Sequence, residues 1–428
     1  MMASEASEAE MNARFRFDGA EVSGCLGEPI AAALMRAGYV ALARSPKYHR
    51  PRGPACFRSA CDGCLARVDG EPNVMTCRAP LRDGSVVESQ NTLGPRRFDL
   101  LRAADWFFPR GMNHHELFAG VPGVQDIMQS FARRVAGLGT MPTEVVATKA
   151  ATRIARAALV IGAGPAGMTL ANALAQRGLA PLVIDEGLVV GGSLLSLPAK
   201  LRAAFASTEA AFAEHVQQGR IELALGTIAG GLFGRDVLVV GRDDGARIAS
   251  ASRLFLCTGA HDGVAAFAGN DMPGIVSVRA AGRLLQLGAV PAKTRIAFVQ
   301  VDASCTLSEA WADEAREHFT VEHVRGTPLA ARGKSRVRGI SVAVDGVTKN
   351  LTADLVAIDA PLSPAYELAA HARATLTPEP RGFVPRRGPD GTIAAGVWAF
   401  GELAGDPLDA DTLRRDATFL AASVGERP

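Results

Sequence analysis

The chain has 428 residues, and at about 150 residues per domain this length allows roughly two to four domains. Its 46 basic and 44 acidic residues give a formal charge of +2, a balance that excludes a dedicated nucleic-acid binder. The hydrophobic content of 48% excludes a largely disordered chain, and the aromatic content of 6% favours α/β layers over an aromatic-rich β-sandwich. No segment is long and apolar enough to span a bilayer, and the acidic N-terminus lacks a signal-peptide pattern, so we expect a cytoplasmic protein.

Residues 15–92 are predicted to form a small α+β domain after an acidic, disordered tail at residues 1–14. Apolar and polar residues alternate on both sides of Asp18-Gly19, a dipeptide that tolerates the positive φ angles of a tight hairpin turn. Pro29 opens a predicted helix and Gly38 closes it. Cys25 is expected as a buried strand residue, and further short strands are expected near 64–68 and 85–88.

Residues 93–153 are predicted to form a connector. Its prolines and its aromatic run Trp106-Phe107-Phe108 indicate a segment draped over a surface. The pair His114-His115 is expected to be solvated or packed, because no carboxylate cluster accompanies it beyond Glu116. From Arg156 a strand–turn–helix pattern begins, and we expect a parallel α/β arrangement to continue to the end of the chain, with strands near 253–258, 295–301, 355–358 and 397–400.

Four of the seven cysteines are spaced Cys-x4-Cys-x2-Cys-x12-Cys, at Cys56, Cys61, Cys64 and Cys77. The first intervals are those of a plant-type [2Fe–2S] run, in which thiolates from one tight loop converge on two irons and the last arrives from another segment. Zinc is the main alternative, although zinc sites usually pair two Cys-x2-Cys knuckles, and four free thiols are a second alternative. Gly63 is expected to relieve crowding between its neighbouring cysteines, and Phe57 and Ser59 stiffen the loop where glycine is common.

Basic residues crowd this cysteine region, and no acidic residue lies between Glu28 and Asp62. One interpretation is a solvated loop face. The other is compensation of an anionic cluster, or a docking surface for an acidic redox partner. The residues concerned are Arg44, Lys47, Arg50, Arg52 and Arg58.

A dinucleotide-binding pattern starts at the apolar run Leu159–Ile161, which leads into G-x-G-x-x-G at Gly162, Gly164 and Gly167. In this pattern the first glycine allows the tight turn, the second admits the pyrophosphate and the third lets the helix pack on the strand. A helix is predicted from Met168 to Arg177 and a strand from Pro181 to Ile184. The acids Asp185 and Glu186 then stand where a ribose is bound, which disfavours NADP.

With these motifs, the chain resembles the two-dinucleotide-binding-domain flavoprotein family. The resemblance implies that further residues surround the dinucleotide: Gly191, Gly192, Thr258, Gly259, Gly401 and Glu402. It also implies a Rossmann-type domain at residues 154–270 plus 371–428 and a second nucleotide-binding domain at 271–370. The second domain is degenerate, because the strand before Gln300 leads into 300–305, which contains no glycine, so we expect no NAD(P)H there. The lack of a Cys-x-x-Cys pair in this half excludes a disulfide reductase.

The N-terminal region is similar to the ferredoxin-like segment of the sarcosine oxidase alpha subunit and of related hydrogen cyanide synthase, opine oxidase and dye-linked proline dehydrogenase subunits. The similarity lies in residues 44–54 before Cys56, 68–74 before Cys77, and 267–275. It implies an α/β fold class with a β-grasp domain before the flavoprotein fold. It further implies a [2Fe–2S] cluster, FAD or NAD in the first site, an FMN at a subunit interface, and a beta-type flavin-oxidase subunit as partner.

The expected function is therefore electron transfer and dinucleotide binding within a multi-subunit flavoenzyme that oxidises an amino acid or secondary amine, of the sarcosine, proline or opine kind. We find binding motifs but no acid–base or nucleophile constellation, so no catalytic residue is assigned. Two alternatives stay open. One is a self-contained FAD-dependent NADH reductase with its own [2Fe–2S] centre, and the other is a non-catalytic scaffold subunit.

Overall fold

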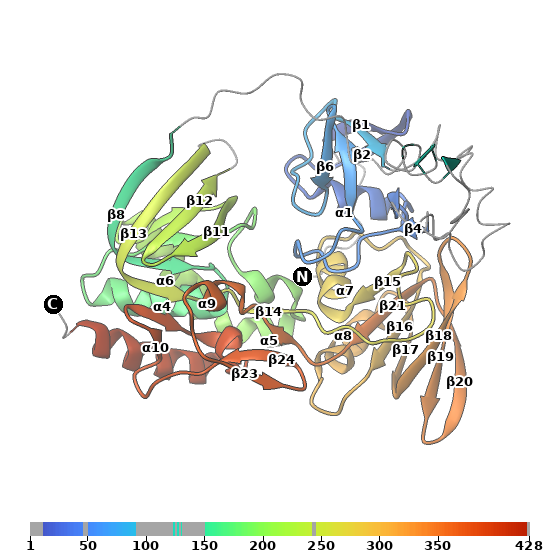
Figure 1. Cartoon of the computed structure of the whole chain (residues 1–428). Coiled ribbons are helices and arrows are strands. Elements are labelled where there is room, and N and C mark those ends of the chain that lie inside the picture. Colours follow the sequence, from blue (N-terminus) through green and yellow to red (C-terminus); the bar gives the residue numbers. More distant parts are fainter. Residues whose placement is uncertain are drawn as a thin grey trace. The chain divides into compact units, whose positions relative to one another are not determined.

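The computed structural model describes residues 12–45, 50–90, 150–241 and 245–425, together with 123, 124, 126, 127 and 130 (Figure 1). Two compact units make up the chain: unit 1 is Met1–Val146 with Val264–Ala360, and unit 2 is Ala147–Gly263 with Pro361–Pro428. The connector residues Trp106–Phe108 and His114–His115 lie outside the described residues. The domain ranges given above stay predictions. Among the described residues, no helix combines the length and apolar character needed to cross a bilayer.

The N-terminal domain of unit 1 is a β-grasp: a five-stranded sheet in the order β2-β1-β7-β5-β6, with helix α1 packed in its core. The predicted hairpin is confirmed, since Asp18 and Gly19 have φ of 48° and 81° between the antiparallel β1 and β2. Helix α1 follows Pro29, and Gly38 has φ of 82° just after the helix ends. The elements are β1 (Ala13–Phe17), β2 (Ala20–Gly24), α1 (Ile30–Arg36), β3 (Ala43–Arg44), β4 (Pro51–Arg52), β5 (Leu65–Val68), β6 (Glu71–Met75) and β7 (Val86–Ser89).

The rest of unit 1 contains a four-stranded parallel sheet, β15-β21-β16-β17. An antiparallel meander, β18-β19-β20, lies in the sequence between β17 and β21. Its elements are β15 (Ile275–Ser277), α7 (Val278–Gln286), β16 (Arg295–Gln300), α8 (Leu307–Ala315), β17 (Thr320–Arg325), β18 (Thr327–Gly333), β19 (Val337–Val344), β20 (Val347–Thr352) and β21 (Leu355–Asp359). Buried Leu284 and Trp311 of this part belong to the same hydrophobic core as Phe17 and Leu34 of the β-grasp. The two parts of unit 1 therefore share one core.

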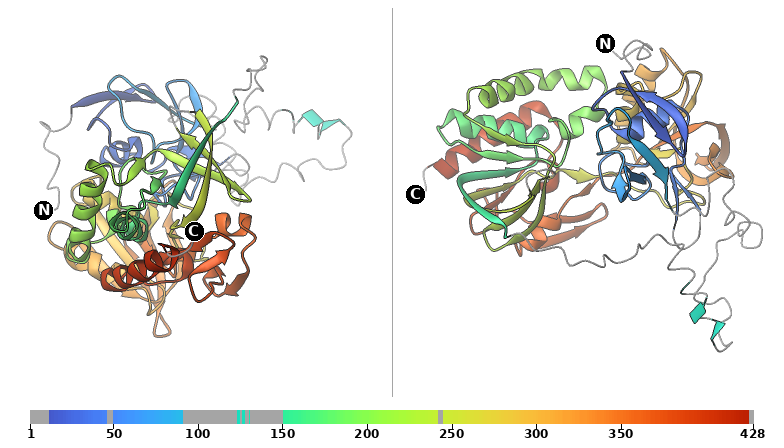
Figure 2. Two further views of the ribbon diagram at one scale, coloured as in Figure 1. Left: turned by 90° about the vertical axis from the view of Figure 1, so that its left-hand side faces the viewer. Right: turned by 90° about the horizontal axis from the view of Figure 1, so that it is seen from above.

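Unit 2 contains an eight-stranded sheet with the path β10-β9-β8-β13-β12-β11, to which β26 adds beside β13 and β25 beside β26. Helices α4, α6 and α10 form a layer on one face of it (Figure 2). The strands and helices are β8 (Thr152–Ile161), α4 (Pro165–Gln176), β9 (Leu182–Ile184), η3 (Gly192–Ser196), α5 (Ala199–Arg202), η4 (Ala203–Phe205), α6 (Ala206–Gln217), β10 (Glu222–Ala224), β11 (Thr227–Phe233), β12 (Asp236–Gly241), β13 (Gly245–Leu256), β14 (Ala260–His261), β22 (Ser363–Pro364), α9 (Glu367–His371), β23 (Leu376–Glu379), β24 (Gly382–Pro385), β25 (Thr392–Ala394), β26 (Val397–Ala399), η5 (Gly401–Ala404) and α10 (Ala410–Gly425).

The expectation of a parallel arrangement up to the C-terminus is wrong in part. Strands β11, β12 and β13 run antiparallel, as do β18, β19 and β20. Both meanders turn at glycine-containing tips, Gly234 with φ of 66° and Gly346 with φ of 79°, which permit tight hairpins. The parallel strands predicted at 295–301, 355–358 and 397–400 are confirmed within one or two residues at their ends. The strand predicted at 253–258 is the last part of β13, which already begins at Gly245.

Candidate metal and dinucleotide sites

Three of the four predicted ligand cysteines lie on the loop between β4 and β5, and Cys77 follows β6. The side chains of Cys56, Cys64 and Cys77 are buried, and Cys61 is partly exposed. The Thr76 hydroxyl donates to the Cys64 carbonyl at 2.6 Å, which fixes the segment of the fourth cysteine against the loop. The fold thus brings the four predicted thiols to one place.

Their sulfur atoms interact as two pairs, Cys56 with Cys61 and Cys64 with Cys77. The hydrogen bond from Cys56 lowers the pKa of Cys61 to about 6, and the hydrogen bond from Cys77 lowers the pKa of Cys64. The same contacts, followed by burial, raise the pKa of Cys56 and Cys77. Across the described residues, no three His, Cys, Asp or Glu side chains are grouped to hold one metal ion. Two adjacent thiol pairs are what the two irons of the predicted [2Fe–2S] cluster would require.

The cysteine loop is held by unusual backbone geometry. Phe57 and Ser59 have φ of 51° and 63°, the left-handed region where glycine is normally found. These turns direct the N–H groups of Arg58 and Ala60 at the Cys56 sulfur, at 3.4 and 3.3 Å. Amide donors of this kind stabilise a thiolate and tune a bound cluster.

One expectation about this region is wrong, and another stays a prediction. A Cβ on Gly63 would lie 2.0 Å from the carbonyl oxygen of Gly53, so glycine here lets two segments of the loop pack closely, and its effect on the neighbouring cysteines stays a prediction. Cys25 is not a buried strand residue: β2 ends at Gly24, and Cys25 is partly exposed in the following turn. Its N–H donates to Glu28 at 2.7 Å, which shapes that turn before α1.

In unit 2 each of the three fingerprint positions requires glycine for a different structural reason. A Cβ on Gly162 would lie 2.3 Å from the carbonyl oxygen of Cys257, and one on Gly167 would lie 1.8 Å from that of Gly162. A Cβ on Gly164 would meet nothing closer than 3.8 Å, so this position borders open space. Helix α4 begins there with no side-chain cap on its free N–H groups. The loop thus offers an anion a cradle at the positive end of a helix.

The two acids after β9 are not equivalent. Asp185 accepts hydrogen bonds from the N–H groups of Ala163 and Gly187, each at 2.6 Å, so it ties the glycine loop to the end of β9. Glu186 is exposed beside it. Glu186 is therefore the acid presented at the surface, and Asp185 shapes the loop.

The remaining predicted residues converge on the same loop. A Cβ on Gly192 would lie 2.9 Å from the Cα of Gly164, and one on Gly401 would lie 2.4 Å from the Cβ of Ala166. Glu402 accepts a hydrogen bond from the Ser193 hydroxyl at 2.9 Å. Gly191 donates to the Ala163 carbonyl at 2.9 Å, and Thr258 and Gly259 follow β13 at the carboxyl end of the sheet. These glycines and acids, distant in sequence, line one edge of the sheet.

The corresponding position of the second domain is filled by the chain itself. Gln300, at the end of β16, is buried and donates to the carbonyl of Asp302 at 3.3 Å, while Asp302 accepts from Ser304. At the N-terminus of α8 the Ser308 N–H already donates to Asp359 at 2.7 Å. A carboxylate thus occupies the place a phosphate would take. Sequence analysis missed Asp359, although an acid directly after the apolar run of β21 is the pattern that could have identified it.

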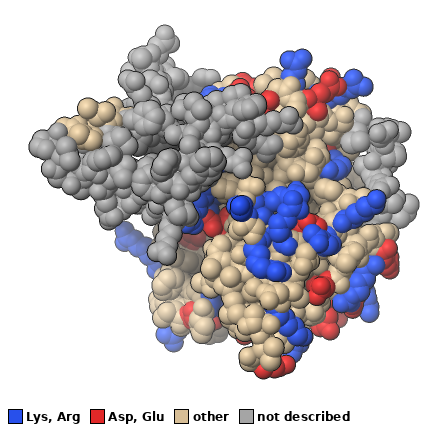
Figure 3. All heavy atoms as spheres, turned by 90° about the vertical axis from the view of Figure 1, so that its right-hand side faces the viewer, with Lys and Arg blue, Asp and Glu red and all other residues tan. Residues whose placement is uncertain are grey.

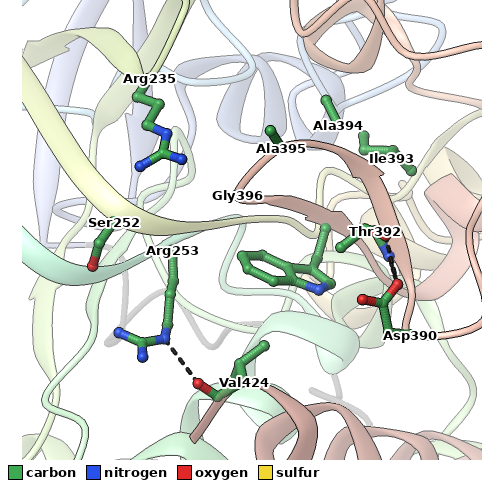
Figure 4. Close-up of a pocket in the computed structure, with 11 residues that line it drawn as sticks. Arg235, Ser252, Arg253, Asp390, Thr392, Ile393, Ala394, Ala395, Gly396 and Val424 are labelled. Atoms are coloured by element: carbon green, nitrogen blue, oxygen red, sulfur yellow. Dashed lines mark hydrogen bonds between the residues drawn. The ribbon is translucent and has the colours of Figure 1, made fainter. Parts of the chain in front are cut away.

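A separate cavity of about 560 Å³ lies elsewhere in unit 2. Arg235 and Arg253 stand on one side of it and Asp390 with Thr392 on the other (Figure 4). It borders Gly396, at the amino end of β26, whereas the glycine loop lies at the carboxyl ends of β8 and β13. None of the predicted dinucleotide residues lines this cavity.

Comparison with known proteins agrees with a cluster-binding domain followed by a dinucleotide-binding fold. Residues 10–92 match the family model of the 2Fe-2S iron-sulfur cluster binding domain, and residues 156–299 match that of the pyridine nucleotide-disulphide oxidoreductases. The predicted fold class is confirmed: a ferredoxin-type domain precedes a Rossmann-type dinucleotide-binding fold. The matches make the chain an oxidoreductase chain and indicate a [2Fe–2S] cluster and FAD as its cofactors.

The chain is similar to sarcosine oxidase subunit alpha of Rhizobium meliloti (strain 1021), with 30% identity over 400 residues. This match covers 83% of the chain but 40% of that protein's length. Among solved structures, L-proline dehydrogenase from P. horikoshii shares the fold, with a TM-score of 0.72 and 19% identity over 99% of this chain and 75% of that one. The predicted resemblance to the sarcosine oxidase alpha group is confirmed.

Proposed function

We propose that the chain is the electron-transfer and dinucleotide-binding subunit of a multi-subunit flavoenzyme that oxidises an amino acid or a secondary amine. One observation carries the proposal: the second dinucleotide position is filled by Gln300, Asp302 and Asp359 of the chain itself. A chain that binds one dinucleotide and a cluster, and takes no NAD(P)H, needs another subunit to supply electrons. The alpha-subunit relative supports such a hetero-oligomer.

In this proposal Cys56, Cys61, Cys64 and Cys77 would hold the [2Fe–2S] cluster. The cluster supplies one-electron transfer. FAD, with NAD as the alternative, lies against the Gly164 cradle. Glu186 would receive its adenosine ribose, and Glu402, which accepts a hydrogen bond from the Ser193 hydroxyl, would also lie near the dinucleotide. A beta-type flavin-oxidase subunit carries the amine chemistry, with an FMN at the subunit interface.

The cluster assignment is tested by purifying the chain anaerobically and measuring iron, zinc and acid-labile sulfide. Equal iron and sulfide, with visible absorption bleached by dithionite, are expected. Cys64→Ser should lose the cluster because Cys64 is buried among the thiols, and Cys25→Ser, the matched control, should keep it. Zinc without sulfide contradicts the assignment.

The subunit assignment is tested by cofactor identification and an NADH–dye assay on the isolated chain. We expect a bound dinucleotide but no appreciable NADH oxidation, because the N-terminus of α8 is already occupied. Co-expression with a flavin-oxidase subunit should yield a stable complex that dehydrogenates an amine. Rapid NADH turnover by the chain alone would replace this proposal with the self-contained reductase.

A further inference from the structure

A strongly basic surface flanks the cysteine loop in unit 1. The turn between β18 and β19, with the strand residues on either side of it, has the sequence Arg332-Gly333-Lys334-Ser335-Arg336-Val337-Arg338, in which Arg332, Lys334 and Arg338 are exposed. Figure 3 shows lysine and arginine side chains gathered in the middle of the face that β18–β20 occupy in Figure 1. We define the basic surface as Arg50, Arg52, Arg295, Arg332, Lys334, Arg336 and Arg338.

A short chain of contacts joins this turn to the cysteine loop. The N–H of Val337 donates to the carbonyl of Pro273 at 2.9 Å. Pro273 in turn packs on the backbone of Gly53, where an added Cβ would lie 3.2 Å from its side chain. Gly53 stands three residues before Cys56. Two contacts thus link the basic turn to Gly53, in the segment that leads into Cys56.

The cations of this surface outnumber their partners. Arg50 and Arg52 share one carboxylate, Asp271, at 3.6 and 3.0 Å. Arg295 and Arg338 share another, Asp354, at 2.8 and 3.1 Å.

Arg332 donates to the carbonyl of Leu351 at 2.6 Å, and Lys334 and Arg336 have no carboxylate partner among the residues that the structure describes. Two carboxylates are thus shared between four of the arginines, on a chain whose formal charge is only +2.

We propose that the basic surface docks an acidic protein that exchanges electrons with this chain at the cysteine loop. This inference rests on the proposed function and names the chemistry of the partner. Electrons would pass at the cysteine loop, where Cys61 is partly exposed. Complementary charge of this kind steers association and sets register.

The first test measures binding of a fluorescein-labelled polyglutamate peptide to the full chain by polarisation. At about 20 mM salt, the triple variant Arg332→Gln/Lys334→Gln/Arg336→Gln should bind at least about tenfold more weakly than wild type, and the difference should shrink by about 300 mM salt. The matched control removes three exposed arginines of unit 2, Arg177→Gln/Arg220→Gln/Arg415→Gln, and should bind like wild type. Equal loss in both variants would overturn the assignment.

The same assay separates the possible occupants. The opposing outcome is that single-stranded DNA or anionic vesicles bind more tightly than the peptide and lose this binding in the triple variant. In that case the surface would belong to a nucleic acid or a membrane, and the proposal would fail. Peptide binding does not require the cluster, so it decides the basic surface even in protein that contains no iron. Absence of iron and sulfide would instead contradict the proposed function.

The second test measures proximity to the cluster. In dithionite-reduced protein, ferricyanide takes one electron from the cluster and becomes ferrocyanide, and hexaamminecobalt(III) takes one electron in the same way. At low salt the triple variant should react roughly threefold to tenfold more slowly with the anionic reagent and faster with the cationic one. Equal responses to both reagents would show that the basic surface does not govern the approach to the cluster.

Discussion

Helix α7 is clamped at both ends by the β-grasp domain, and Arg36 makes the stronger clamp. At the N-terminal end the Ser277 N–H donates to the carbonyl of Ala55, one residue before Cys56, at 2.9 Å. At the C-terminal end the Arg36 guanidinium donates to the carbonyls of Leu287 and Gly288 at 2.8 and 3.0 Å. A cation at a helix C-terminus also stabilises the helix, because it interacts favourably with the negative end of the helix dipole. We therefore predict that Arg36→Met loosens α7 from the cluster domain.

The expected loss of unfolding free energy follows from Glu28, the buried partner that remains when Arg36 is replaced. Its guanidinium forms a bidentate pair with Glu28, both contacts at 2.8 Å, and the two side chains are 15% and 8% exposed. The hydrogen bond to Glu28 raises the pKa of Arg36 against the opposing effect of burial. Removing one partner of a buried pair costs about 3–5 kcal/mol, because the other charge stays buried and uncompensated. Glu28→Gln should cost less, about 1–3 kcal/mol, since an amide still accepts one N–H from Arg36.

The assay is a double-mutant cycle on the full chain with Arg36→Met, Glu28→Gln and both together. Urea unfolding of unit 1 gives the free energies, and hydrogen exchange of the α7 amides and of Ser277 reports the docking. The double variant should lose less than the sum of the single losses, by about 2 kcal/mol. A loss below about 0.5 kcal/mol for Arg36→Met, or unchanged exchange in α7, would refute the clamp.

Three further predictions test separate features. Gly164→Val should abolish the flavin absorbance of the purified chain with an unchanged circular dichroism spectrum, because its side chain enters open space in the cradle; retained flavin contradicts the site. The hydrogen bond from Arg295 lowers the pKa of Asp354 from 3.8 to about 2, so the pair stabilises the fold above about pH 4. The unfolding free energy lost in Asp354→Asn, about 1–2 kcal/mol near pH 7, should vanish as pH falls towards 2; a difference that does not depend on pH argues against it. Ser59→Gly should relieve about 1 kcal/mol of left-handed strain and slow cluster loss on heating, whereas Ser59→Ala should not; equal behaviour of the two removes the strain argument.

Sequence patterns predicted the parts of the fold that depend on local chemistry. The Asp18-Gly19 turn needs two positive φ angles, and few other dipeptides provide them. The third fingerprint glycine is required by a clash within the turn, with the carbonyl oxygen of Gly162, whereas the first is required by the carbonyl oxygen of Cys257, far along the chain. The motif still identifies the strand, the turn and the helix together. The thiol spacing is similarly local, because one loop carries three of the four cysteines.

The features that sequence patterns missed depend on partners far along the chain. Arg36 and Gly288 are 252 residues apart, and neither lies in a motif that announces the other. Phe57 and Ser59 reach the left-handed region although neither residue favours it, which requires the surrounding packing to enforce the loop. The antiparallel meanders escaped because short strands such as β20, with polar residues at most positions, show no clear alternation of burial.

The second domain makes physical sense as a platform for the cluster domain. In an open parallel sheet, ligands bind at the carboxyl ends of the strands, where helix N-termini are free. Here the chain's own groups occupy both of those ends: Asp359 accepts from the N-terminal turn of α8, and Ala55 accepts from Ser277 at the start of α7. Burial raises the pKa of Asp359, and the Ser308 N–H opposes that rise, so the helix end helps this carboxylate to stay charged. An edge that could otherwise bind a dinucleotide therefore contacts Ala55, the residue next to Cys56. This contact holds the thiol cluster in place relative to the basic surface.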